Sequence, residues 1–309
     1  SRTSPTNIGL SLLANLSAYD LGYLSAGKML ERTQLTFTTM GDLKKFRGHL
    51  YNWYDTHTLE PLPPLYVSSV DSGNLAGHLL TLSGGLNELK DAPIYTPVIF
   101  SGLLDTVRVM KRYTVKNAAI AQLEKDLDES PQTLQGALTL LQWVKQQTDS
   151  IGTSLADNNN EVQSWIQTLK KNIEDHIEEL LHLAPWLHIY QPTPHEDLDG
   201  NLDEVISQIK ELDNGLTLRE VSQLDETICP LIEITLMRLS NLKNPSAKEH
   251  IISYLNLWLS NLHKAVSHAS RRIQMIRTLI DQSESFANMD FAFLYSTSKK
   301  LFVIGYNVT

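Results

Sequence analysis

Cysteine is nearly absent from this sequence, which excludes an internal disulfide. Cys229 is the one cysteine among 309 residues. Its neighbours Ile228, Leu231 and Ile232 predict a thiol packed as a small hydrophobic group. A nucleophilic role needs a base that the fold would have to supply, because none lies nearby in the sequence. This cysteine usage favours the cytoplasm.

Positive charge is also scarce. The chain carries 26 Lys and Arg against 35 Asp and Glu, a net charge of −9. Phosphate binding depends on clustered basic side chains, and the nearest approach to a cluster is Arg271 with Arg272 in an apolar periodic stretch. We therefore expect no nucleic acid among the partners.

Long apolar runs are missing as well. The longest weakly charged stretch, Ala92 to Leu104, is too short to cross a bilayer and contains Pro93 and Pro97. No signal peptide is recognisable at the N-terminus. We expect no membrane span in this segment, and the 42% hydrophobic content predicts a globular core instead.

Motifs for metal and phosphate binding are not found. Gly84-Gly85 lacks the spacing and the Lys-Ser/Thr of a phosphate loop. His176 and His182 are wrongly spaced for one helical face, and prolines separate His188 from His195. We expect no metal and no cofactor. A Ser-His-Asp arrangement stays open, although no Gly-x-Ser-x-Gly elbow occurs.

Acidic pairs occur along the expected helices. Glu178 with Glu179 and Asp126 with Asp128 are two of them. We interpret both pairs as solvated helix faces, not as catalytic carboxylates.

Helix signals dominate the N-terminal part. Ser4 before Pro5 predicts a helix start, followed by Leu10, Leu13 and Leu16. A second helix is expected from about Ser25 to Gly41, and a third from Asp71 to Leu82 with Asp71 or Ser72 as its cap. Between them, Phe46 to Tyr54 predicts a short extended segment or hairpin, and Pro61, Pro63 and Pro64 predict irregular structure.

The middle of the chain has a helical period throughout. Apolar residues recur at spacings of three and four, and near the end they form a heptad series of Leu255, Leu259, Leu262, Val266, Ala269, Ile273, Ile276 and Ile280. Such a seam packs long helices side by side. We expect a bundle of long antiparallel helices, with breaks at Ser130-Pro131, Asp157 to Asn160, Pro185 to Gly200 and Asn244-Pro245, and an exposed loop from Pro192 to Asp203.

The predicted fold is mainly all-α, with one or two short β-hairpins. Residues 1–83 form the first expected domain, 84–283 a helical bundle, and 284–309 a returning hairpin with Phe291 to Tyr295 and Leu301 to Tyr306 as its strands. Lysines lie in or beside its turn.

Side chains suited to a sugar gather in the N-terminal part. Flat rings cover the apolar C–H face of a sugar, while Arg, His, Asn and Asp bond its hydroxyls. The first group of residues is Arg47, His49, Tyr51, Asn52, Trp53, Tyr54 and Asp55, and the second is Asp71, Ser72 and Asn74. The alternative for the first group is a core hairpin packed on the first two helices. The alternative for the second group is helix capping.

Four ordered segments resemble cyclic β-1,2-glucan synthases. They run from Arg2 to Leu10, from Arg47 to Asp55, from Tyr66 to Leu79, and from Met289 to Leu294 together with Ile304 to Tyr306. The helical middle is similar in character more than in residues.

The resemblance implies a fragment of the central region of such a synthase. That region resembles glucoamylase-like (α/α) toroids and closes linear β-1,2-glucan into a ring by transglycosylation with two carboxylic acids. The family pattern places those acids beyond Thr309, so no catalytic residue is assigned. It also implies a cytoplasmic soluble part of an inner-membrane protein, in which residues 3–83 supply toroid helices and the ten candidate residues line part of the glucan cleft.

The partners implied are β-1,2-glucan and the other domains of the parent synthase. Uncovered apolar helix faces also predict possible self-association. Two further functions stay open: part of a related β-glucan hydrolase, or a non-catalytic helical scaffold that docks neighbouring domains.

Overall fold

The computed structural model describes residues 1–114, 117–155, 160–189, 202–240 and 246–308. It confirms a mainly all-α fold, with short strand pairs beside the helices. Its contacts define two compact units. Unit 1 comprises Ser1–Asp20, Ala26–Leu89 and Gln274–Thr309, and unit 2 comprises Leu21–Ser25 and Lys90–Ile273.

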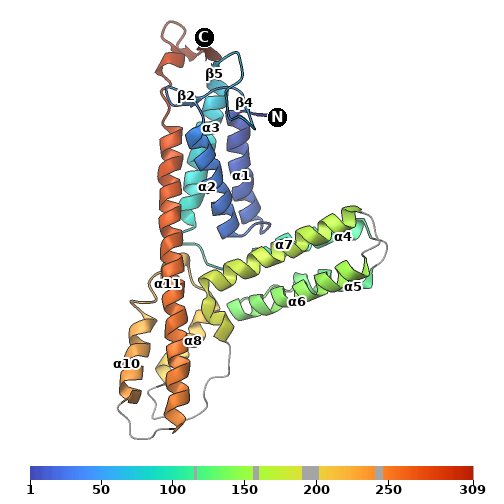
Figure 1. The fold of residues 1–309 in the computed structure, drawn as a ribbon, viewed down its shortest axis with the longest axis vertical. Helices are drawn as coiled ribbons and strands as arrows, with labels where there is room; N and C mark the ends of the chain where they lie inside the picture. Colours follow the sequence, from blue (N-terminus) through green and yellow to red (C-terminus); the bar gives the residue numbers. More distant parts are fainter. Residues whose placement is uncertain (115–116, 156–159, 190–201, 241–245, 309) are drawn as a thin grey trace. The chain divides into compact units, whose positions relative to one another are not determined.

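Unit 1 is built on three helices from the start of the chain and the last turns of a fourth (Figure 1). They are α1 (Pro5–Asp20), α2 (Ala26–Asp42), α3 (Ser69–Glu88) and α11 (Ser246–Ala287). The predicted start of α1 is confirmed, because Ser4 Oγ accepts from Asn7 N at 3.3 Å. Phe37 of α2 meets Phe286 of α11 edge to face at 5.4 Å between ring centroids.

Four antiparallel strand pairs cap these helices at one end. The pairs are β1 (Arg2–Thr3) with β4 (Tyr54–Asp55), β2 (Lys45–Phe46) with β3 (His49–Leu50), β5 (Tyr66–Ser68) with β8 (Gly305–Asn307), and β6 (Tyr295–Ser296) with β7 (Leu301–Phe302). The hairpin expected near Phe46 is therefore confirmed. The strand expected from Phe291 to Tyr295 is wrong for Ala292–Leu294, which form the short 3-10 helix η3.

The cap predicted for the third helix is also wrong. Ser68 is the N-cap of α3, and its hydroxyl accepts from Asp71 N at 3.1 Å. Asp71 and Ser72 consequently lie inside the first turn, where their side chains are available for contacts with other segments. A serine three residues before an acid is the usual beginning of a helix, and Ser68 satisfies that spacing one turn earlier than we expected.

Unit 2 contains the remaining helices. They are α4 (Val98–Arg112), α5 (Ala118–Asp128), α6 (Leu134–Ser154), α7 (Asn160–Leu183), η1 (Pro185–Ile189), α8 (Asp203–Glu211), η2 (Leu212–Asn214), α9 (Leu218–Val221), α10 (Ile228–Ser240) and the first part of α11. Helices α4 to α7 pack on one another as neighbours in a four-helix arrangement. Cys229 is buried as predicted, and burial raises the pKa of its thiol to about 11.

Five of the eight residues predicted for the apolar seam of α11 are buried, including Ile273, and the other three lie beside the seam. Leu255, Leu262, Ala269 and Ile276 are buried, one in every seven residues. Between them, Trp258, Ala265 and Leu279 are buried, whereas the predicted Leu259, Val266 and Ile280 are half-exposed. At each half-exposed seam position, the neighbouring residue one or more places away is also apolar, so the period of the sequence alone does not decide which of the two is buried. Burial of the large Trp258 ring favours the observed phase.

A close approach of backbones in unit 2 requires two glycines. A Cβ on Gly102 of α4 would lie 2.3 Å from Gly22 O, and Gly22 itself has a φ of +76°. His176 of α7 is buried against the same loop, and its Nε2 donates to Gly22 O at 3.2 Å. The segment 21–25 is fixed in unit 2 by these contacts.

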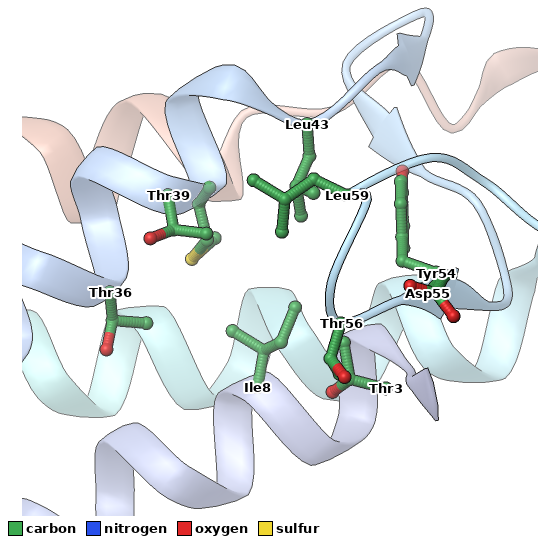
Figure 2. A pocket seen from close by; sticks show the side chains of 10 residues that line it. Thr3, Ile8, Thr36, Thr39, Leu43, Tyr54, Asp55, Thr56 and Leu59 are labelled. Atoms are coloured by element: carbon green, nitrogen blue, oxygen red, sulfur yellow. The ribbon is translucent and has the colours of Figure 1, made fainter. Parts of the chain in front are cut away.

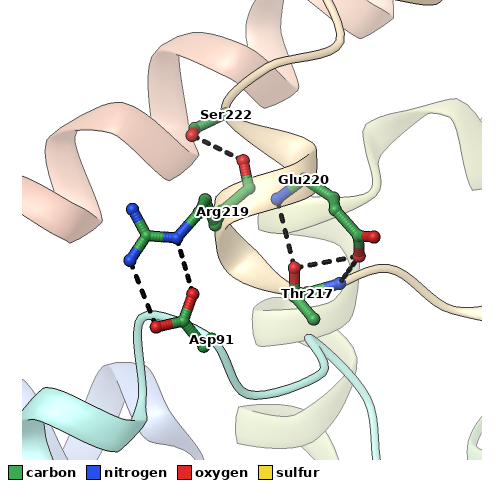
Figure 3. A network of polar contacts seen from close by, with 5 residues as sticks. All are labelled: Asp91, Thr217, Arg219, Glu220 and Ser222. Carbon is green, nitrogen blue, oxygen red and sulfur yellow. Dashed lines mark hydrogen bonds and ion pairs between the residues drawn. The ribbon is translucent and has the colours of Figure 1, made fainter.

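A polar network joins two further segments of unit 2 (Figure 3). Arg219 of α9 forms a bidentate pair with Asp91, at 2.5 Å from Nε and 3.1 Å from Nη2. Thr217 caps α9 and exchanges hydrogen bonds with Glu220. The side chains are exposed, so they fix geometry more than they add stability.

Glu179 corrects one of our expectations. Its side chain is only 12% exposed, and both of its oxygens accept from Arg272, at 2.6 and 3.1 Å. The expected solvated face at Glu178 with Glu179 is therefore wrong for Glu179, because a cation 93 residues away in the sequence covers it.

Three expectations fall outside the described residues. The first concerns His195. The second concerns positions 192–201 of the loop expected from Pro192 to Asp203, and the third concerns the helix breaks at positions 157–159 and 244–245. Within the described ranges, no helix combines the length and apolarity needed to cross a bilayer.

Candidate functional site

The hairpin that carries the first group of candidate residues turns at Arg47 and Gly48. Both have positive φ, 50° and 85°, as a two-residue turn requires. The Arg47 guanidinium lies 3.5 Å from an Asp290 carboxylate oxygen and 5.3 Å from the Phe293 ring centroid. Arg47 therefore fastens the hairpin to the segment after α11.

His49 is fully buried and bonded at both ring nitrogens. Nε2 lies 2.8 Å from Asp290 O, and Nδ1 lies 2.8 Å from Ser72 Oγ. Because a carbonyl can only accept, Nε2 carries the proton of the neutral ring and Nδ1 accepts from Ser72. Phe291 and Phe293 meet the ring edge to face. His49 and Ser72 thus connect three segments of unit 1.

Tyr54 and Tyr51 also serve the packing of the hairpin. The Tyr54 hydroxyl donates to Lys44 O at 2.5 Å and accepts from Tyr51 N at 2.8 Å. Its ring is fully buried, and burial raises the pKa of the phenol well above its usual 10. The alternative of a core hairpin therefore describes His49, Tyr51 and Tyr54 well.

A second set of candidate residues forms one connected polar network, which we call the Asp71 network. Asp71 accepts from Thr6 Oγ1 at 2.6 Å, and Thr6 in turn accepts from Asn74 Nδ2 at 3.3 Å. In the orientation that satisfies both of its ends, the Asn52 amide donates to Asp71 Oδ2 and accepts from Trp53 Nε1, each at 3.0 Å. Side chains from α1, α3 and the loop before β4 meet here.

Arg2 and Thr6 belong to the Asp71 network, although sequence reasoning missed them. The Arg2 guanidinium lies 4.2 Å from the centre of the Trp53 ring. Pairing of β1 with β4, which sets Arg2 opposite Asp55, brings it there. The signal available in the sequence was that both residues lie in the segment from Arg2 to Leu10 that resembles the synthases.

Asp55 is held apart from the Asp71 network. Its Oδ1 accepts from His57 N at 2.8 Å and Thr58 N at 3.0 Å, and these hydrogen bonds keep the pKa of the carboxyl below its usual range. It is therefore ionised at neutral pH. Asp55 borders a cavity of about 270 Å³, which we call the threonine pocket.

The threonine pocket combines hydroxyls with an apolar floor (Figure 2). Thr36 and Thr39 lie at one end, Thr3, Thr56 and Asp55 at the other, and Ile8, Met40, Leu43, Tyr54 and Leu59 complete the lining. Thr36 and Thr39 donate to backbone carbonyls of α2, which leaves their oxygens free to accept. Such a lining suits a small neutral ligand with hydroxyl groups.

The described residues contain no cluster of three or more His, Cys, Asp or Glu side chains that could hold a metal ion. The Asp71 network contains one carboxylate and one guanidinium, whose charges balance, together with amides and a hydroxyl beside an aromatic ring. Asp71 and Asn52 are half-buried and Asn74 is exposed, which leaves their remaining lone pairs and donors accessible.

Buried histidines predict a loss of stability in acid. Burial lowers the pKa of His49 and of His176 below the ordinary 6.5, whereas the unfolded chain accepts both protons near that pH. The stability they provide is complete above pH 6.5 and falls as the pH decreases, by up to about 1.4 kcal/mol per pH unit for each histidine. Urea unfolding between about pH 7.5 and pH 5.5 measures this slope. A flat profile would contradict the buried neutral rings.

Comparison with curated proteins shows a similarity over part of the chain. No family model matches the chain. The chain is 45% identical over 111 residues to the cyclic beta-(1,2)-glucan synthase NdvB of Rhizobium meliloti (strain 1021). The predicted resemblance to such synthases is confirmed. The match covers 36% of this chain and 4% of NdvB, so it concerns a small part of that protein.

Proposed function

We propose that this chain is part of a cyclic β-1,2-glucan synthase, from the central glucoamylase-like region that closes linear β-1,2-glucan by transglycosylation. The similarity to NdvB supports a synthase fragment. The central region is inferred from the four segments that resemble the family, all of which lie in unit 1. In the parent enzyme this piece would face the cytoplasm beside a membrane-embedded part.

The Asp71 network is the observation that carries the proposed sugar contact. It joins the two groups of candidate residues through Asn52 and Asp71, with Trp53 at one end and Asn74 at the other. Trp53 is half-buried, so part of its ring remains open to the apolar face of a glucose unit. The carboxylate, amides and hydroxyl of the network then bond the sugar hydroxyls.

The proposed sugar contact involves fewer than the ten residues expected from sequence. His49, Tyr51, Tyr54 and Ser72 are buried in packing and support the wall, while Arg47 holds the hairpin to Asp290. Asp55 belongs to the threonine pocket, which at about 270 Å³ is at the small end of ligand sites and would take one sugar unit. No residue of this chain is proposed as nucleophile or general acid.

Truncation of Trp53 tests the sugar contact directly. We expect Trp53→Ala to weaken binding of linear β-1,2-glucan oligosaccharides roughly tenfold, because about 1.4 kcal/mol of ring stacking is lost. Isothermal titration calorimetry on the 309-residue chain gives the affinity. Asn52→Ala should weaken binding in the same direction.

The control is Trp165→Ala, which removes a half-buried indole from α7 in unit 2. Its affinity should equal that of the unsubstituted chain. Equal affinity for Trp53→Ala and the unsubstituted chain would remove the Asp71 network from the proposed cleft. If Trp53→Ala left the affinity unchanged and Trp165→Ala lowered it, the sugar contact would lie in unit 2 instead.

A further inference from the structure

Unit 2 has a groove that nothing so far explains. It lies between α5 and α6, includes Asp213 of η2, and has a volume of about 780 Å³, within the range of small-molecule sites. We call it the Trp143 groove after its one aromatic lining residue.

Trp143 is unusually exposed for its size and yet held in place. The side chain is 46% exposed on α6, and its Nε1 donates to Asp126 Oδ2 of α5 at 3.1 Å. Asp126 is itself fixed, because its Oδ1 accepts from Gln122 at 2.8 Å. The ring therefore presents a flat apolar face whose orientation is set before any ligand arrives.

The groove also offers hydrogen-bond acceptors. Gln135 Oε1 is buried and has no hydrogen-bond partner among the described residues. Gln135 N donates to Asp213 at 2.7 Å, which holds this residue against η2. That oxygen is sealed from the open groove, so the acceptors within reach of a ligand are the carboxylates of Asp126, Glu129 and Asp213.

Charge restricts the class of ligand. Three carboxylates, on Asp126, Glu129 and Asp213, line the groove against the single ammonium of Lys125. Phosphates and other anions are disfavoured by this balance. A neutral ligand with many hydroxyl donors and one apolar face can bond the carboxylates and cover the indole at the same time.

We propose that the Trp143 groove is a second saccharide-binding site, separate from the Asp71 network, that holds a segment of a neutral glucan chain. The choice of β-1,2-glucan as its ligand rests on the proposed function. The inference that the groove binds a saccharide rests on its stacking and acceptor chemistry and does not depend on the proposed function. A glucan site in unit 2 would hold one segment of a long glucan chain while another segment of the same glucan is bound in unit 1.

Fluorine NMR on the chain labelled with 5-fluorotryptophan tests both sites in one titration. The sequence holds five tryptophans, so five signals are expected, and Trp143→Phe and Trp53→Phe assign the two that matter. With linear β-1,2-glucan we expect the Trp143 signal to shift and saturate. Glu129→Ala, which removes one of the three carboxylates from this exposed rim, should raise the dissociation constant at Trp143 roughly tenfold and leave the shift of Trp53 unchanged.

Each outcome separates this inference from the proposed function. A Trp143 signal that stays fixed while Trp53 saturates overturns the groove and leaves the proposed function standing. A shift of Trp143 without Trp53 supports the groove and removes the Asp71 network. A shift of Trp143 with spermidine but not with glucan overturns the saccharide site in favour of a cation site.

Discussion

Replacing His49 with alanine is expected to destabilise unit 1 by about 3–5 kcal/mol. The substitution removes a fully buried ring and leaves Ser72 Oγ and Asp290 O without their partners. Urea unfolding monitored at Trp53, which lies in unit 1, reports this loss. Unit 2 should unfold as before when followed through Trp143.

The matched control for this histidine is His57→Ala. His57 is exposed on the loop after β4, and a change there should stay within about 0.5 kcal/mol. If His49→Ala left the unfolding of unit 1 unchanged but weakened glucan binding, His49 would be a ligand contact and its supporting role would be refuted. His49→Phe keeps the ring volume and separates the lost hydrogen bonds from the lost packing.

Replacing Glu179 with glutamine is expected to destabilise unit 2 by about 3–5 kcal/mol. The change keeps the shape of the side chain and removes its charge, so the Arg272 guanidinium, 11% exposed, is left buried without a counter-ion. Urea unfolding followed at Trp143 is the measurement.

Two further variants sharpen the Glu179 prediction. Glu174→Gln breaks the exposed pair with Lys145, in which the side chains are 44% and 38% exposed, and should cost less than about 1 kcal/mol. The double variant Glu179→Leu with Arg272→Leu should recover most of the loss, because neither charge then remains buried. Equal effects of Glu179→Gln and Glu174→Gln would show that the Arg272 pair is solvated in solution.

Local chemistry made much of the fold predictable. Ser4 with Pro5 marks the start of α1, and the ring-rich stretch from Phe46 to Tyr54 indicated an extended segment or hairpin, because both signals depend on residues a few positions apart. The predicted cap of α3 was wrong by one turn, and three of the eight residues predicted for the seam of α11 lie beside it. In both cases the sequence offered two neighbouring solutions, and packing against distant segments selected one.

For the candidate site residues too, the sequence shows which residue types are present but not which of them are in contact. Residue types alone grouped His49 with Trp53, yet His49 is buried by Asp290, which lies 241 residues later. Trp53 and Asp71 were both named as candidates, but Thr6, which donates to Asp71, lies 65 residues before it and was not. Contacts of this range are set by tertiary packing, and no sequence period encodes them.

The bond between His49 and Asp290 has a consequence for synthesis on the ribosome. Unit 1 needs residues from both ends of the chain, whereas positions 90–273 of unit 2 form one uninterrupted stretch. At typical translation speeds, Asp290, which lies 241 residues after His49, is synthesised on the order of tens of seconds later. We therefore expect unit 2 to be able to fold before the strands that follow α11 can pair with unit 1. During that interval the apolar surface of unit 1 that the last segment covers is exposed, a condition that favours aggregation.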